Sequence, residues 1–150
     1  MLQTAGIILL VLVALNLVPA RPVYAATFTV TKTADTNDGT CDADCSLREA
    51  IGAANASPGA DTITFAPALN GSPITLSIPG AGENANATGD LDITGDLTIT
   101  GNGTRNTIIN GGGVDRVFEI IGNRTVTMTD LTTTGGTMSG GGVYQTTANV

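Results

Sequence analysis

Beyond residue 60 the chain is a succession of short β-type runs cut by Gly, Asn and Asp, and this pattern limits the possible folds most strongly. The runs cover residues 62–65, 74–78, 91–94, 97–100, 107–109, 117–121, 126–129 and 131–134. Within several runs Thr alternates with aliphatic residues, which places the aliphatic side chains on one strand face and the hydroxyls on the other. The intervening residues tolerate positive φ and end strands. We therefore expect an all-β domain.

Two architectures suit short strands with polar turns. An antiparallel sandwich requires hairpins of alternating direction, whereas a parallel β-helix stacks each strand on the strand one coil later. From Leu97 to Phe118 is 21 positions and from Phe118 to Tyr144 is 26. This spacing predicts a solenoid with coils of about 20–25 residues. Aromatic residues make up only 3% of the chain, so the core must stack small aliphatic side chains regularly, which favours the β-helix.

A single amphipathic helix is predicted just before the strands, over residues 47–56. Ser46 and Glu49 have the spacing of a capping box, in which each side chain accepts a hydrogen bond from the other residue's N–H. The residues that share the apolar helix face are Leu47, Ala50, Ile51 and Ala54. A helix of this length needs a surface to lie on, and the open first coil of a solenoid needs a lid. We expect Arg48 to be solvated; a catalytic Arg48–Glu49 pair is the alternative.

Cys41 and Cys45 are the only cysteines and stand four positions apart. A disulfide is possible if the chain turns there, because the two Cα atoms must lie within about 7 Å. A zinc site would need further ligands, and the chain has no His and no third Cys. A redox pair more often has two intervening residues. We favour a structural disulfide over free thiols, because residues 1–25 predict export to a compartment in which disulfides persist.

Residues 1–25 are typical of a secretory signal peptide. Residues 7–18 are apolar except for Asn16, and cleavage is expected between Ala25 and Ala26. The apolar run is shorter than the roughly 20 residues that span a bilayer. An uncleaved membrane anchor and a buried helix remain the alternatives. Export predicts a secreted or cell-envelope protein, with no stable membrane span after cleavage.

The segment Cys45-Ser46-Leu47-Arg48-Glu49-Ala50-Ile51, followed by Asn55, resembles the CSLREA motif. Segments 61–65, 95–101 and 116–120 resemble the sequence downstream of the motif in that family. The resemblance implies an exported surface protein with a right-handed parallel β-helix, and it brings no catalytic residues because the family has no agreed activity. It also implies a longer protein.

We therefore expect three regions, which are a signal-peptide helix over 1–25, an N-terminal cap over 26–60, and the first coils of a truncated β-helix over 61–150.

Candidate chemistry is limited to carboxylates, since the absence of His excludes triads and imidazole ligands. Asp90, Asp92 and Asp96 are close in sequence, and Asp90 and Asp92 could project from one strand face. These three are weak candidates for a Ca²⁺ site, because hard-cation sites need several converging oxygens. Asp96 begins a turn, where a carboxylate is usually solvated or bound to backbone. We otherwise expect no cofactor.

The net charge of −7 and the lack of a basic run argue against nucleic-acid partners. The leading hypothesis is a secreted or cell-surface scaffold, adhesin-like and without catalysis in this segment. Its partners would be extracellular polysaccharide or a neighbouring cell surface. The alternative is the N-terminal part of a polysaccharide lyase or glycoside hydrolase of the pectate-lyase-like β-helix type. A third possibility is a fragment with no independent function.

Overall fold

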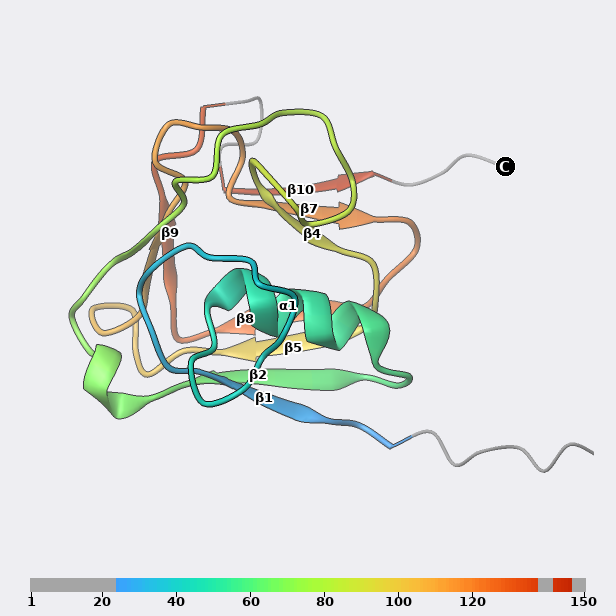
Figure 1. The fold of residues 1–150 in the computed structure, drawn as a ribbon, viewed down its shortest axis with the longest axis horizontal. Coiled ribbons are helices and arrows are strands. Elements are labelled where there is room, and N and C mark those ends of the chain that lie inside the picture. The colour runs from blue at the N-terminus through green and yellow to red at the C-terminus, as the bar shows by residue number, and fades with distance from the viewer. Residues whose placement is uncertain (1–23, 138–141, 147–150) are drawn as a thin grey trace, which may run out of the picture.

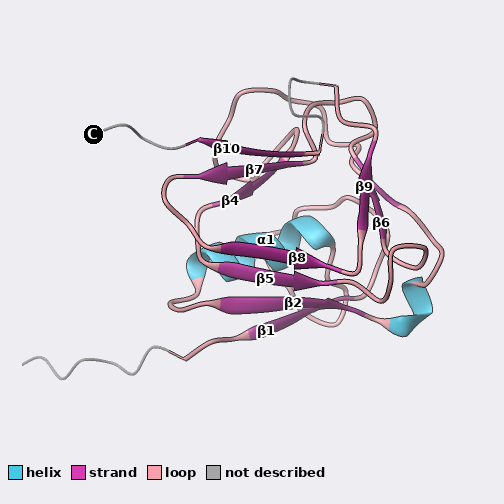
Figure 2. Cartoon of the chain, turned by 180° about the vertical axis from the view of Figure 1, so that it is seen from behind, coloured by secondary structure: helices cyan, strands magenta, loops and turns pink. Residues whose placement is uncertain are grey.

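A computed structural model of the chain describes residues 24–137 and 142–146. Its strands form three parallel sheets, as Figures 1 and 2 show from opposite sides. The first sheet has the order β1-β2-β5-β8, the second β3-β6-β9 and the third β4-β7-β10. The elements in chain order are β1 (Thr27–Val30), α1 (Leu47–Ala56), β2 (Asp61–Phe65), a 3₁₀ turn (Pro67–Leu69), β3 (Ile74–Thr75), β4 (Leu91–Ile93), β5 (Leu97–Thr100), β6 (Ile108–Asn110), β7 (Phe118–Ile121), β8 (Val126–Thr129), β9 (Thr132–Thr134) and β10 (Val143–Thr146).

The chain visits the three sheets in the same order on each turn, which makes the fold a parallel β-solenoid. One coil contains β2, β3 and β4; the next contains β5, β6 and β7; the third contains β8, β9 and β10. Every pairing between coils is parallel. The antiparallel sandwich is therefore excluded, and the expected mostly-β architecture is present.

The predicted coil length of about 20–25 residues holds for two pairings of the last coil, in which Ile108 pairs with Thr132, 24 positions later, and Phe118 with Val143, 25 positions later; the earlier coils are longer. Leu97 pairs with Val126 and not with Phe118, which lies in a different sheet between β4 and β10. One turn advances the chain by 35 residues between β1 and β2 and by 29 residues near the start of β8. The difference lies in the turns: long loops between strands leave the register of the paired strands intact while changing the coil length.

The core is a continuous column of aliphatic side chains inside the coils. Phe28, Ile63, Ile99 and Met128 occupy one register position on four successive strands, and all belong to the core or pack against it. The Thr residues between them point outward, and the hydroxyls of Thr29 and Thr64 hydrogen-bond across two strands at 3.1 Å. The alternation read from the sequence thus matches the observed faces.

Strand β1 and helix α1 form the turn of chain that precedes the coil of β2, β3 and β4, and the helix takes the place of that turn's other two strands. It packs against β1, β2 and β4 (Figure 1), with Leu47, Ala50, Ile51 and Ala54 in the core. The first sheet begins with β1, whereas the other two sheets have no strand from this turn. The helix therefore covers the end of the solenoid core that those missing strands would leave open.

Two strands were not among the eight predicted runs, namely β1 and β10. Strand β1 has the same Thr–apolar alternation as the others, but its residues were expected to belong to the cap. The expected signal-peptide helix lies almost entirely in residues 1–23, outside the described residues. In the part of the chain that is described, no helix combines the length and the apolar character that crossing a membrane requires.

Candidate functional site

Two groups of buried charged residues lie close together around the first coils. The first, which we call the cap network, consists of Asp35, Arg48 and Glu49. The second, which we call the acidic cluster, consists of Asp90, Asp92 and Glu119. The two groups meet at Asp90, whose backbone carbonyl accepts a hydrogen bond from Arg48.

Arg48 is buried, contrary to the expectation of a solvated side chain; it is only 1% exposed. Its Nε donates to Asp35 Oδ1 at 2.8 Å, and Nη2 donates to Asp35 Oδ2 at 3.2 Å. Nη1 and Nη2 also reach the carbonyls of Asp90 and Gly89, each at 2.8 Å. The expectation of a solvated Arg48 was wrong. Helical periodicity places a residue on one face of the helix, but it does not show which distant segment packs over that face.

Asp35 completes this ion pair from the loop between β1 and α1. Its Oδ2 also accepts from the N–H groups of Ser77 and Ile78, at 2.8 and 3.1 Å. Burial opposes ionisation, but Arg48 and these two N–H groups together hold the pKa of Asp35 below its usual value. One charged pair thus ties α1 to two separate loops.

Glu49 and Ser46 form the capping box that the sequence predicts. The Ser46 N–H donates to Glu49 Oε2 at 2.7 Å, and the Glu49 N–H donates to Ser46 Oγ at 3.0 Å. Glu49 Oε1 accepts from the Thr36 hydroxyl and the Asp38 N–H. Although burial works against ionisation, these donors lower the pKa of Glu49 to about 2. The carboxylate is therefore a structural anion.

Cys41 and Cys45 form a disulfide with a Cα–Cα separation of 4.5 Å. Cys45 is fully buried, and its carbonyl accepts from the Thr31 N–H at 2.9 Å. The bridge stands directly before the N-cap of α1. It therefore constrains the loop that contributes Thr36 and Asp38 to the cap network.

Asn55 covers the free edge of β4 from the last turn of α1. Its Nδ2 donates to the Asp92 carbonyl at 2.7 Å, and its Oδ1 accepts from the Thr94 N–H at 2.9 Å. These are the backbone groups that a preceding strand would have paired. The side chain thus blocks strand addition at an edge that would otherwise be open.

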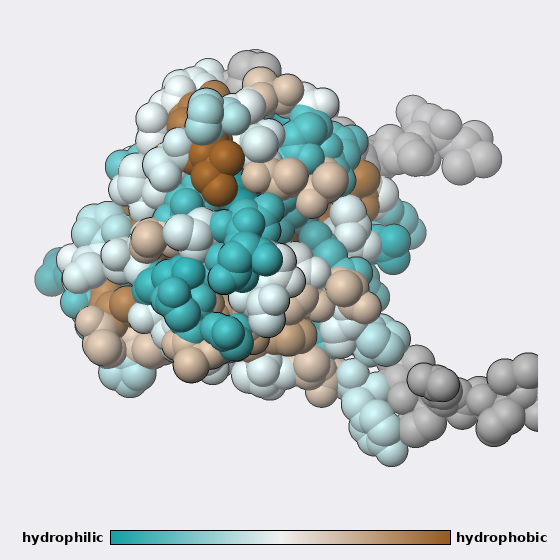
Figure 3. Space-filling view, viewed as in Figure 1, coloured by the Kyte–Doolittle hydropathy of each residue, from teal (hydrophilic) through white to brown (hydrophobic). Residues whose placement is uncertain are grey.

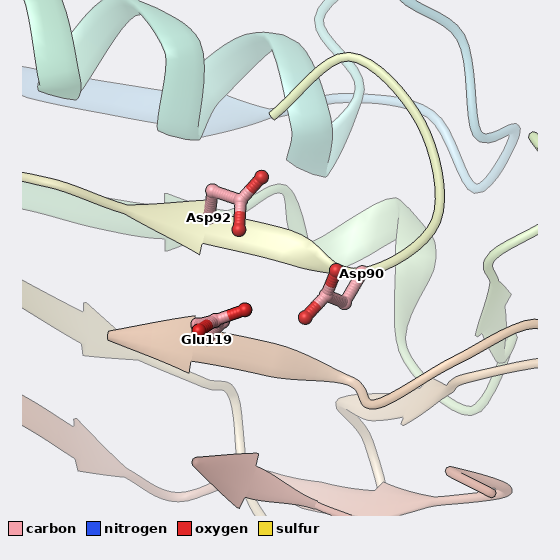
Figure 4. A group of neighbouring side chains, drawn as sticks. All are labelled: Asp90, Asp92 and Glu119. Atoms are coloured by element: carbon pink, nitrogen blue, oxygen red, sulfur yellow. The ribbon is translucent and has the colours of Figure 1, made fainter. Parts of the chain in front are cut away.

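The acidic cluster lies on the outer face of the third sheet. Leu91, Ile93, Phe118 and Ile120 face the core, so Asp92 and Glu119 point to the opposite side, where they are register partners. Asp90 precedes β4 and turns toward the same space, as Figure 4 shows. One carboxylate oxygen from each of the three residues lies within 4.8 Å of the others.

The cluster is buried although it lies on an outer face. Asp90 is 1%, Asp92 0% and Glu119 4% exposed. Its cover is the loop between β3 and β4, in which the Asn86 N–H donates to Asp92 Oδ2 at 2.8 Å. Gly89 closes this loop by donating to the Ile78 carbonyl at 3.0 Å. A Cβ at Gly89, which has φ +64°, would lie 2.6 Å from the Gly80 carbonyl oxygen, so glycine is required there.

Arg116 is the cationic side chain that contacts the cluster. Its Nε donates to Asp90 Oδ2 at 2.8 Å, and its Nη2 contacts Glu119 Oε2. The other oxygens of the two aspartates, Asp90 Oδ1 and Asp92 Oδ1, are buried without a hydrogen-bond partner. The cluster therefore contains more acceptor capacity than the surrounding protein satisfies.

The electrostatics of the acidic cluster are opposite to those of the cap network. Burial, together with nearby carboxylates such as those of Asp90 and Glu119, raises the pKa of Asp92 to about 7. Burial likewise raises the pKa of Glu119, with Asp90 and Asp115 adding to the effect and Arg116 opposing it. The arrangement favours a proton or a cation between these groups.

Of the three carboxylates singled out in the sequence, the structure brings Asp90 and Asp92 together and leaves Asp96 apart. Asp96 is exposed, and its Oδ1 accepts from the Thr125 N–H at 2.8 Å, which is the turn role that weighed against it as a ligand. Glu119 was missed because it is 27 residues from Asp92 in sequence. Only the strand register could have revealed it.

Seen from the side of Figure 1, the surface is mostly polar or neutral, and its apolar residues form small separate groups (Figure 3).

Comparisons of the chain with protein-family models, with curated proteins and with solved structures find no match.

Proposed function

We propose that this protein is an exported, non-catalytic β-solenoid scaffold that acts outside the cytoplasm, on the cell surface or in secreted form. The observation that carries the proposal is the cap: the buried Arg48–Asp35 pair, the capping box and Asn55 close the first coil without presenting a reactive group. A solenoid closed in this way can serve as a rigid spacer or display surface.

The resemblance to the CSLREA family supports this proposal through the same residues. Within the segment 45–51, every side chain is buried in the cap, so the motif describes a folding unit and not a catalytic one. The family further implies that the solenoid is right-handed, which agrees with the strong preference of parallel crossover connections.

Two features support export. The apolar residues 7–18 and the small residues before Ala26 have the form of a cleavable signal. The Cys41–Cys45 disulfide fits an oxidising compartment, where such bonds persist. Extracellular polysaccharide or a neighbouring cell surface would then be the partner.

Expression of the full chain in a bacterial host tests export. We expect the protein outside the cytoplasm, with a mass and N-terminal sequence that begin at Ala26 and with the two cysteines oxidised. Ala25→Arg should leave an uncleaved precursor, because the cleavage site requires a small residue, whereas Ala26→Ser should be processed normally. Retention of the intact chain in the cytoplasm would contradict the proposal.

The rival function, cleavage of polysaccharide along the solenoid, requires accessible carboxylates. The carboxylates that the structure groups together are instead covered by the loop between β3 and β4. Incubation with uronate polymers, followed by ultraviolet absorbance of unsaturated products, distinguishes the two. A Ca²⁺-dependent release of such products would overturn the scaffold proposal in favour of the enzyme.

A further inference from the structure

We propose that Asp90, Asp92 and Glu119 bind a divalent cation of the size of Ca²⁺ between β4 and β7. The site lies under the loop that joins β3 to β4. One carboxylate oxygen from each residue lies within 4.8 Å of the others, and Asp90 and Asp92 each have an oxygen that is buried without a hydrogen-bond partner. The assignment concerns this site alone and does not depend on whether the protein is exported.

The spacing of the oxygens fits Ca²⁺. Protein oxygens bind Ca²⁺ at about 2.3–2.6 Å, so two ligands on opposite sides of the ion are about 4.6–5.2 Å apart. No two of the three ligand oxygens are further apart than 4.8 Å. Mg²⁺ is disfavoured on other grounds, because it demands near-ideal octahedral geometry and gives up its bound water reluctantly.

The second observation is the orientation of the two aspartates. Asp90 Oδ2 is held by Arg116 Nε, and Asp92 Oδ2 is held by the Asn86 N–H, both at 2.8 Å. Each carboxylate is thereby fixed through one oxygen, and its Oδ1 is buried without a partner. Figure 4 shows both side chains turned toward the space that Glu119 also faces. A buried carboxylate oxygen without a donor is costly unless a cation or proton accompanies it.

The excess of buried negative charge around the acidic cluster also favours a bound cation. Asp115 is also buried and contacts Arg116 at 3.9 Å, so this region holds four buried carboxylates, three of which contact Arg116. Arg48, the other nearby cation, is already engaged by Asp35 and two backbone carbonyls. A bound divalent cation would supply the missing positive charge, which a single arginine cannot do.

Further oxygen ligands are needed, because Ca²⁺ takes six to eight. Asn86 stands over the site, and its Oδ1 is buried without a partner. Its φ of 56° lies in the left-handed region, a conformation that Asn tolerates better than most residues. We infer that Asn86 and water molecules complete the coordination and that the loop is ordered by the ion.

Terbium luminescence tests the site, because Tb³⁺ replaces Ca²⁺ at oxygen sites and emits when a nearby tyrosine is excited. The chain has no Trp and two Tyr. Tyr144 is the register partner of Glu119, and its ring lies 5.3 Å from the Arg116 guanidinium carbon, whereas Tyr24 is 73% exposed before β1. With the full chain in mild detergent, we expect Tyr-sensitised Tb³⁺ emission that Ca²⁺ displaces, and Tyr144→Phe should abolish the emission without abolishing Ca²⁺ binding.

Ligand variants complete the test, with Ca²⁺ binding measured directly by calorimetry. Asp92→Asn and Glu119→Gln should each weaken Ca²⁺ binding by about tenfold or more, since each removes a charged ligand. Asp96→Asn makes the same charge change at an exposed carboxylate outside the cluster and should leave the affinity unchanged. Mg²⁺ should compete poorly.

Three results would overturn the proposal: wild-type protein without displaceable Tb³⁺ emission or Ca²⁺ heat, equal losses in the Asp96→Asn control, or equal affinity for Mg²⁺. If one ligand variant fails to fold, the other, together with Tyr144→Phe, still decides between these outcomes.

Discussion

The cap network and the acidic cluster both bury charge, yet they do so in opposite ways. In the cap network, Asp35 and Glu49 are surrounded by donors, and the pKa of each is held below its usual value. In the acidic cluster, burial first and neighbouring carboxylates second raise the pKa of Asp92 and of Glu119. The two regions are nearly in contact, since Arg48 binds the carbonyl of Asp90.

The two regions differ in how completely their buried charges are matched by donors. Buried charge contributes to a stable fold when every donor and acceptor is matched, as around Arg48. A surplus of buried acceptors destabilises the fold on its own and is relieved by a ligand or by protonation. The cap network therefore has the properties of a structural element, and the acidic cluster has the unmatched acceptors on which our proposed cation site depends.

The largest loss of stability is expected for Arg48→Met, which disrupts the cap network. It leaves Asp35 buried and unpaired and removes the donors to the carbonyls of Gly89 and Asp90. We expect a loss of about 3–5 kcal/mol in the free energy of unfolding, measured by urea denaturation. Arg105→Met, at an exposed position, should change it by less than about 0.5 kcal/mol. A similar small change in both variants would show that the cap network contributes little.

The second prediction concerns how the free energy of unfolding changes at acid pH because of Glu49. Its folded pKa of about 2 lies below its unfolded value, so its contribution is present above about pH 4.5 and is lost as pH falls toward 2. The shift corresponds to about 3 kcal/mol. Glu49→Gln should flatten the stability profile between these pH values in urea unfolding, whereas Asp44→Asn, at a 76% exposed side chain, should retain it. An unchanged profile in Glu49→Gln would contradict this account.

Asp92→Asn should change stability in the opposite direction from the cap variants, because it removes a carboxylate that is unfavourable in the fold. The folded pKa of about 7 lies above the unfolded value, so without added cation the folded state binds the extra proton and stability falls as pH rises from about 4 to 7. We expect the variant to be about 1–3 kcal/mol more stable than wild type at pH 8 in EDTA. Thermal unfolding across this pH range checks it; a destabilised variant would place Asp92 with the matched groups of the cap.

The smallest effect concerns Asn55, where the cap meets β4. Asn55→Ala removes two hydrogen bonds to backbone groups of the strand edge. We expect a loss of about 1–2 kcal/mol and faster hydrogen exchange at the Thr94 amide. Asn123→Ala, at an exposed position, is the matched control. Unaltered exchange at Thr94 would mean that the edge is protected by other means.

Much of the fold could be predicted from local patterns. The helix, its cap and each of the eight strand runs depend on neighbouring residues, as in Ser46–Glu49 or Leu97–Thr100. The length of the longer coils could not be predicted, because the pairing of Leu97 with Val126 depends on how each long loop closes. The choice of Phe118 as the next-coil partner failed for that reason.

Only part of the candidate site could be predicted from the sequence. Asp90 and Asp92 were visible as close neighbours in sequence, but Glu119 joins them through the register of β4 and β7. Arg48 shows the same limit, because its burial depends on Asp35 and on the loop carrying Gly89. Contacts between distant segments are set by the whole coil and not by local sequence.

Local sequence patterns are enough to predict the short alternating strands, the capped helix and the nearness of Cys41 to Cys45. These features arise from side-chain alternation, capping and short loops, which act over a few residues. Only the tertiary structure decided which strands stack, that Arg48 is buried, and that Asp90, Asp92 and Glu119 share one space without enough donors. Burial and register are properties of the assembled coils, because a neighbour from a distant segment determines whether a charge is matched or left in surplus.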